Sequence, residues 1–251
     1  MWRRRAAAML AFLLVAAPAL AAQQDPHLDR YEARTIVTGT DLRSRPAGLA
    51  ACLADVLAKV SGDPTVLDDP RLPALESHAA DYATGFDYWD RMSGIPHHDE
   101  QGSSDRPYNL TVRFTRDGID AALRTLGREP WTTPRPPLVV VVHVVGARDT
   151  FDVTTIEPRA AGMRAAIRDA GEKYGMDWAI MSDPQARPPG FVPLVGALVL
   201  SEAALGWVAD WHLDWQGSGY DWGVRGVNFD AAFRDGVRGA MQVLSGHGAP
   251  R

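Results

Sequence analysis

Three side chains that could bind a metal or transfer protons are regularly spaced in the segment WVADWHLDWQGSGYDWGV, residues 207–224. Asp210, His212 and Asp214 occupy alternate positions. Alternate side chains of a β-strand point to the same side, so these three could ligate a metal ion or form an acid–base site. A solvated sheet face gives the same pattern. Because the sequence identifies no further ligand on a second strand, we favour the solvated face over the metal site.

A second group of potential ligands lies in the polar loop PHHDEQGSSDRP, residues 96–107. The loop begins with His97, His98, Asp99 and Glu100, which could bind a metal or act as an acid–base cluster. Consecutive residues rarely converge on one ion, so a metal-assisted hydrolase is the alternative interpretation and not the leading one.

A structural or partner-binding role is the leading prediction for this loop. Asp99 or Asp105 could pair with Arg106 or Arg135 and tie the loop to the linker between two domains. The partner-binding candidates are therefore His98, Asp99, Glu100, Asp105, Arg106, Trp131 and Arg135.

The last two candidates come from the linker REPWTTPRPP. Trp131 and Arg135 are residue types that often anchor protein interfaces. The alternative, which we weigh equally, is that Trp131 only wedges between the domains.

The usual catalytic signatures do not occur in the sequence. It contains no H-E-x-x-H, no G-x-S-x-G and no phosphate-binding glycine loop. The prediction is a protein with no catalytic residues, no metal and no cofactor.

Two α+β domains position these residues. Residues 23–127 form the first domain, which contains the amphipathic helix GLAACLADVLAKV; its apolar stripe includes Cys52, which we interpret as a small core residue. YNLTVRFT alternates as a half-buried strand and GIDAALRTLG follows as a helix. Residues 128–137 are a proline-rich linker, since proline disfavours both helix and central strand.

Residues 138–246 form the second domain. LVVVVHVV is a strand covered on both faces, followed by a helix and a short strand. A three-strand antiparallel meander and a C-terminal helix capped by Asn228 complete it. The predicted fold class is α+β, with two small α/β-sandwich-like domains, the second a β-α-β unit followed by the meander and helix.

The tryptophans of the opening segment share one face if residues 206–216 form a strand. Trp207, Trp211 and Trp215 then alternate with Asp210, His212 and Asp214. The leading interpretation is a core face on which the last helix lies, because aromatic residues dominate core energetics. The alternative is a stacking platform for peptidoglycan or another glycan.

The N-terminal stretch MWRRRAAAMLAFLLVAAPALAA, residues 1–22, has a basic region, a short apolar run and a small-x-small end. This pattern predicts a cleavable signal peptide and a periplasmic protein without membrane insertion. Removing its three arginines from 26 basic residues leaves 23 against 31 acidic ones, a net charge of −8. An acidic chain without a basic face is a poor binder of nucleic acid.

Several stretches resemble a family of secreted proteobacterial proteins known as domain of unknown function 2066. They are VLAKVSGDPTVL, HDEQGSSDRPYNLTVRF, LGREPWTTPRPPLVVVV and the terminal pattern WVADWHLDW…YDWGVRG…FDAAFRDGV. The resemblance implies a secreted protein and no established activity. The sequence therefore predicts a non-catalytic binding or envelope-assembly module whose partner is another cell-envelope protein.

Overall fold

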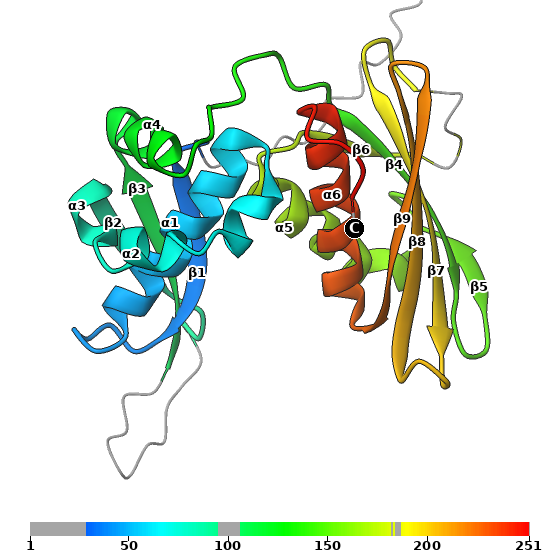
Figure 1. Ribbon diagram of the computed structural model, residues 1–251. Coiled ribbons are helices and arrows are strands. Elements are labelled where there is room, and N and C mark those ends of the chain that lie inside the picture. Colours follow the sequence, from blue (N-terminus) through cyan, green and yellow to red (C-terminus); the bar gives the residue numbers. More distant parts are fainter. Residues whose placement is uncertain (1–28, 95–105, 182, 184–186, 251) are drawn as a thin grey trace, which may run out of the picture.

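The computed structural model describes residues 29–94, 106–181, 183 and 187–250. The described chain forms two lobes that lie side by side and meet at one end (Figure 1). Each lobe has its own sheet and its own apolar core. The predicted α+β class with two small domains is confirmed.

The N-terminal domain is a three-stranded antiparallel sheet with helices packed on one face. Its strands have the order β1-β3-β2, so β1 and β2 are edge strands. The core lies between the sheet and α1, with α4 closing one end. The elements are β1 (Glu32–Thr38), α1 (Arg45–Ser61), η1 (Pro64–Asp68), α2 (Leu72–Glu76), α3 (Ala79–Tyr82), β2 (Ala83–Asp90), β3 (Pro107–Phe114) and α4 (Arg116–Thr125).

Helix α1 contains the predicted helix GLAACLADVLAKV and extends it by a few residues to Arg45–Ser61. Pro46 lies in the first turn, where a missing N–H costs nothing, and Gly62 ends the helix with a φ of 71°. Cys52 is fully buried against the sheet, and burial raises the pKa of its thiol to about 12. Its interpretation as a core residue is confirmed.

The C-terminal domain has a six-stranded mixed sheet with α5 and α6 on one face (Figure 1). β4 pairs in parallel with β6 and β7, and β7, β8 and β9 form the antiparallel meander. The elements are β4 (Leu138–Val145), β5 (Thr150–Asp152), η2 (Pro158–Ala160), α5 (Ala161–Tyr174), β6 (Trp178–Ile180), β7 (Val192–Ser201), β8 (Gly206–Trp215), β9 (Ser218–Val227) and α6 (Phe229–Leu244). The predicted β-α-β unit, meander and C-terminal helix are confirmed, and the side chain of Asn228 caps that helix at the amide of Ala231.

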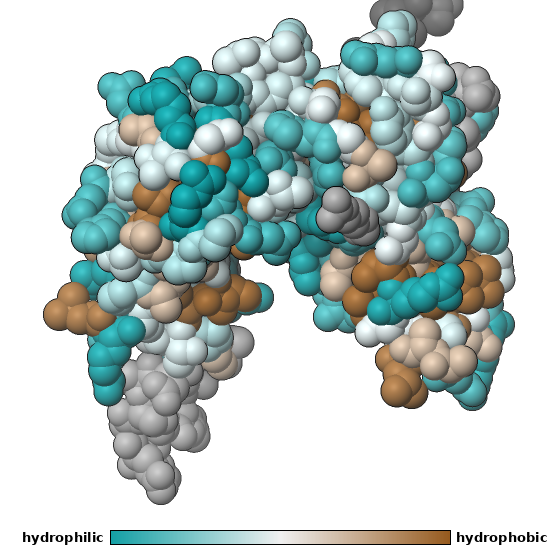
Figure 2. All heavy atoms as spheres, viewed as in Figure 1, coloured by the Kyte–Doolittle hydropathy of each residue, from teal (hydrophilic) through white to brown (hydrophobic). Residues whose placement is uncertain are grey.

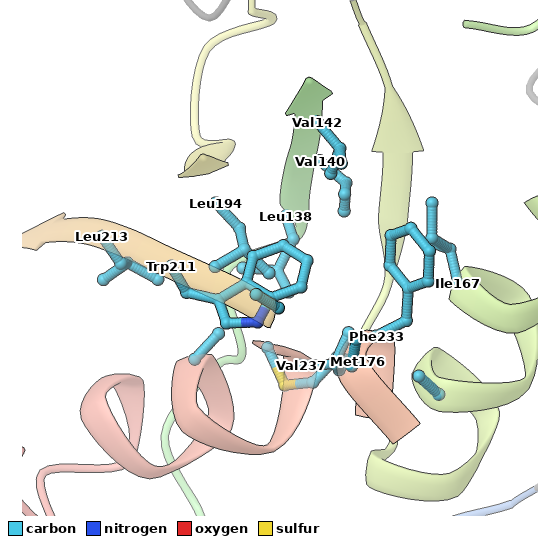
Figure 3. Close-up of a cluster of buried hydrophobic side chains, with 14 of the residues drawn as sticks. Leu138, Val140, Val142, Ile167, Met176, Leu194, Trp211, Leu213, Phe233 and Val237 are labelled. Carbon is cyan, nitrogen blue, oxygen red and sulfur yellow. The ribbon is translucent and has the colours of Figure 1, made fainter. Parts of the chain in front are cut away.

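Trp211 lies at the centre of the second core, between β8 and α6 (Figure 3). Its side chain is 2% exposed and its ring lies 5.9 Å from that of Phe233. Gly196 on β7 and Gly236 on α6 let the indole of Trp211 lie against the backbones of β7 and α6, because a Cβ at either position would overlap the ring. The tryptophan face of β8 therefore belongs to the core, as predicted, with Trp211 buried and Trp207 and Trp215 partly buried against it. A role of this face in stacking sugars stays a prediction.

Candidate ligand-binding cleft

A cleft of about 580 Å³ lies between the two domains. Figure 2 shows the hollow that separates the two lobes. The volume is within the range of about 300–1,000 Å³ that is usual for ligand sites. The lining comes from β1, the end of β2, β3, α1, α5 and α6: Ala33, Arg34, Thr35, Ile36, Asp55, Lys59, Trp89, Arg91, Asn109, Arg168, Asp169, Glu172, Lys173 and Arg234.

The lining is positively charged, although the chain as a whole is acidic. Six basic and three acidic side chains line the cleft, a local excess of three positive charges in a chain whose net charge is −5. A concave surface of one sign concentrates ligands of the opposite sign.

Each of the three carboxylates already has a cationic partner. Glu172 of α5 pairs with Arg34 of β1 at 3.2 Å, and Asp55 of α1 pairs with Lys173 of α5 at 2.5 Å. Asp169 pairs with its neighbour Arg168 at 3.1 Å. The first two pairs also link the N-terminal domain to α5.

Lys59 is the most deeply buried of the remaining cations. Its side chain lies in α1, is 1% exposed and donates from Nζ to the carbonyl oxygen of Glu32 at 2.6 Å. Burial lowers the pKa of its ammonium to about 8, although Asp55 and Glu172 oppose the shift. Position 59 continues the apolar stripe of α1 that contains Cys52 and Val56, and this spacing is the one sequence signal for its burial.

Arg91 and Arg234 are the other two cations without a carboxylate partner among the described residues. Arg91 follows β2 in the N-terminal domain and Arg234 lies on α6 in the C-terminal domain, so the two guanidinium groups belong to opposite walls of the cleft. Both are exposed. No local pattern in the sequence predicts this arrangement, because the folded chain alone brings the two residues together.

The N-terminal wall also carries apolar surface. Ile36 on β1 is 57% exposed and Trp89 on β2 is 60% exposed, and both line the cleft. They lie on the outer face of the sheet, opposite α1. An anionic ligand with apolar side groups matches this combination of charge and exposed hydrocarbon.

Trp131 and Arg135, two of the predicted partner contacts, lie in the junction that joins the domains. The indole of Trp131 is 8% exposed, belongs to the core of the C-terminal domain and carries the guanidinium of Arg135 at 4.3 Å. Burial lowers the pKa of Arg135 to about 10. The structure thus places Trp131 between the domains, the alternative weighed above, and its contact with a partner stays a prediction.

These linker residues cap the C-terminal ends of α1 and α5. Arg135 donates to the carbonyl oxygens of Lys59, Tyr174 and Gly175, and the amide of Trp131 donates to Val60. The last carbonyls of a helix lack intrahelical partners and attract positive charge. The junction is therefore a set of directed bonds, which holds the walls of the cleft in place.

The remaining partner-binding candidates lie largely outside the described residues. Residues 95–105 are not among those that the structure describes, and they include His97, His98, Asp99, Glu100 and Asp105. Their roles stay predictions. Arg106 is described and pairs with Asp90 at the end of β2, at 3.0 Å, rather than with the linker.

Asp210, His212 and Asp214 lie on the face of β8 that α6 does not cover. The ring of His212 lies 2.7 Å from Asp221 on β9 and 3.3 Å from Asp214. The bond to Asp221 is the main reason that the pKa of His212 is raised. In the part of the chain that the structure describes, no three His, Cys, Asp or Glu side chains have the geometry of a metal site.

Residues 25–132 match the family described as "Domain of unknown function (DUF8605)". This is a different family from domain of unknown function 2066, so the resemblance stated from the sequence is wrong. No curated protein and no solved structure matches the chain.

One structural finding bears on the membrane. Within the described residues, no helix combines the length and the apolar composition that crossing a bilayer requires.

Proposed function

We propose that the protein is a non-catalytic binding protein of the cell envelope and that its inter-domain cleft takes an anionic ligand. The observation that carries the proposal is the excess of positive charge in the cleft, where each carboxylate is already paired and three cations are not. The sequence pattern of residues 1–22 supports the location.

Arg91 and Arg234 are the groups that reach the ligand first. Both are exposed and have no carboxylate partner among the described residues, whereas Lys59 is buried. Guanidinium groups form paired hydrogen bonds to carboxylates, sulfates and phosphates, so each can hold one anionic group. Two such groups on opposite walls favour a ligand with more than one negative charge.

The test uses two labelled polyanions of different chemistry, a short oligoglutamate and a sulfated oligosaccharide of similar charge. We expect fluorescence anisotropy to show binding of at least one of them at low salt. The affinity should fall as salt is added, because screening weakens contacts between exposed charges.

The double variant Arg91→Gln with Arg234→Gln should weaken that binding by roughly fivefold to thirtyfold, from two exposed charge pairs of about 0.5–1 kcal/mol each. Arg148→Gln is the matched control, because Arg148 is an exposed arginine in the turn between β4 and β5 and does not line the cleft. The proposal fails if neither probe binds, or if the control variant weakens binding as much as the double variant.

A further inference from the structure

The cleft runs along the edge of a β-strand. Four consecutive residues of β1, Ala33 to Ile36, line it. Successive side chains of a strand point to opposite faces, so a cleft over one face would be lined by alternate residues only. β1 is an edge strand of its sheet and is the strand nearest to the C-terminal domain (Figure 1).

The hydrogen bonds at the ends of β1 show which of its residues face that edge. Phe114 donates to the carbonyl of Tyr31 at 2.9 Å, and Gly39 donates to the carbonyl of Arg106 at 2.9 Å. The pairing between β1 and β3 has no register shift, and hydrogen-bonded pairs alternate with non-bonded ones in an antiparallel ladder. The odd-numbered residues of β1 therefore bond to β3, and Glu32, Arg34, Ile36 and Thr38 present their N–H and C=O groups to the free edge.

The first of these outward groups is already occupied. Lys59 Nζ bonds to the carbonyl oxygen of Glu32, which confirms the direction deduced from the ladder. The backbone groups of Arg34, Ile36 and Thr38 have no hydrogen-bond partner among the described residues. A row of unpaired donors and acceptors at a sheet edge is a template for a further strand.

We infer that the ligand of the cleft is an extended acidic peptide segment of a partner protein, which adds to β1 as a fourth strand. In this mode, main-chain bonds to the edge supply affinity and the surrounding side chains supply selectivity. The inference rests on the proposed function, since it assigns a chemical class to the same anionic ligand.

The walls of the cleft fit the alternating side chains of such a strand. Ile36 and Trp89 offer exposed apolar surface on the outer face of the sheet. Lys59 comes from α1, which packs on the opposite face of that sheet, and Arg234 comes from α6 of the C-terminal domain. A segment in which apolar and acidic residues alternate would place one set on the apolar face and the other set against the cations.

The probe for this inference is a labelled, end-blocked hexapeptide in which valine and glutamate alternate. We expect it to bind the wild-type protein more tightly, by at least about tenfold, than the peptide in which lysine replaces each glutamate. The charge excess in the cleft is the reason.

Methylation of the peptide amides tests the added strand itself. In one peptide every second amide carries a methyl group, and in a second peptide the other set carries it. Only one set faces β1, so one peptide should lose binding by about tenfold or more and the other should keep it, since each net backbone hydrogen bond contributes about 0.5–1.5 kcal/mol.

A matched pair of protein variants tests the same contact from the other side. Ile36→Pro removes an outward N–H, which an edge strand tolerates, whereas Ile36→Val keeps it. The proline variant should weaken the valine–glutamate peptide several-fold and the valine variant should not.

The outcomes separate this inference from the proposed function. If both methylated peptides bind equally well, or both fail, while anionic probes still bind through Arg91 and Arg234, the strand is not added and only the anion site stands. If the sulfated oligosaccharide binds and the glutamate peptides do not, the ligand is a glycan and the inference is wrong. If no anionic probe binds, the proposed function itself fails. The methylated peptides use the wild-type protein, so the test does not depend on the folding of the proline variant.

Discussion

Neighbouring side chains of β8 point to opposite faces of the sheet, one into the core and one towards solvent. Trp211 is almost completely buried between two glycines, whereas the side chain of His212 is 43% exposed. The alternation of tryptophans with polar residues predicted this phase from sequence. The bonds of His212 to Asp221 on the next strand could not be predicted, because the register of β8 with β9 decides them.

Replacing Trp211 by alanine should lower the free energy of unfolding by about 3–5 kcal/mol, because a large ring leaves a cavity in the core. His212→Ala should change it by less than about 1 kcal/mol, since exposed ion pairs contribute little. Urea denaturation of both variants measures the contrast. Equal losses would mean that the polar face of β8 is not simply solvated.

The burial of Lys59 makes the stability of the protein depend on pH. Its folded pKa of about 8 lies below the ordinary value of 10.5, because burial disfavours the charged form. The unfolded chain therefore holds this proton more tightly, and stability from this group rises as the pH passes from about 8 towards 10.5. Below pH 8 both states are protonated and the contribution is constant.

The comparison of wild type with Lys59→Met isolates this effect from other titrating groups. Between pH 8 and pH 9 the unfolding free energy of the wild type should rise by about 1 kcal/mol relative to the variant. Denaturant titrations at the two pH values measure it. A difference that is flat or falls with pH would show that the ammonium is not desolvated.

Helices and strands with a strong apolar periodicity were predicted from the sequence, whereas a strand with a weak periodicity was not. α1, β3, β8 and α6 follow from their apolar spacing and their caps. β2 was not predicted, because its sequence ATGFDYWD contains a glycine and two aspartates, which are rare in strands. In the structure its pairing with β3 is irregular near its start, and aromatic rings of the strand are exposed. Between α1 and β2 the chain forms two short helices, α2 and α3, and the hydroxyl of Ser77 bonds to the carbonyl of Ala74 where α2 ends.

The cleft could not be predicted from the sequence, because its residues come from elements that are far apart in the chain. Its three unpaired cations come from α1, the end of β2 and α6, and no short motif connects them. The linker that orients the two walls was found from its prolines. Its bonds to the end of α1 depend on tertiary structure and gave no sequence signal.

The capping of α1 by the linker predicts the effect of removing Arg135. Arg135→Ala leaves the carbonyl oxygens of Lys59, Tyr174 and Gly175 without their buried donor. We expect a loss of about 2–3 kcal/mol in unfolding free energy, as for hydrogen bonds to a charged group. Thermal unfolding measures the loss, with Arg148→Ala as an exposed control. A variant as stable as the control would show that the junction does not hold the domains together.

At the scale of the whole molecule, two small domains create a site that neither domain contains alone. The N-terminal domain provides a strand edge with apolar neighbours, and the C-terminal domain provides α5 and α6 with their cations. Arg34–Glu172 and Lys173–Asp55 join the walls across the cleft. The family match ends at residue 132, so it includes the strand edge and excludes α5 and α6.

Residue-resolved amide hydrogen exchange of β1 measures whether its outward backbone groups are free and whether a peptide strand binds to them. In the free protein, the amides of Arg34, Ile36 and Thr38 should exchange fast and those of Ala33, Thr35 and Val37 slowly, because only the second set bonds to β3. The valine–glutamate peptide should slow the first set by about tenfold or more and leave the second set unchanged. Similar exchange of all six amides in the free protein, or a bound peptide that leaves the first set fast, would show that no strand is added at the edge of β1.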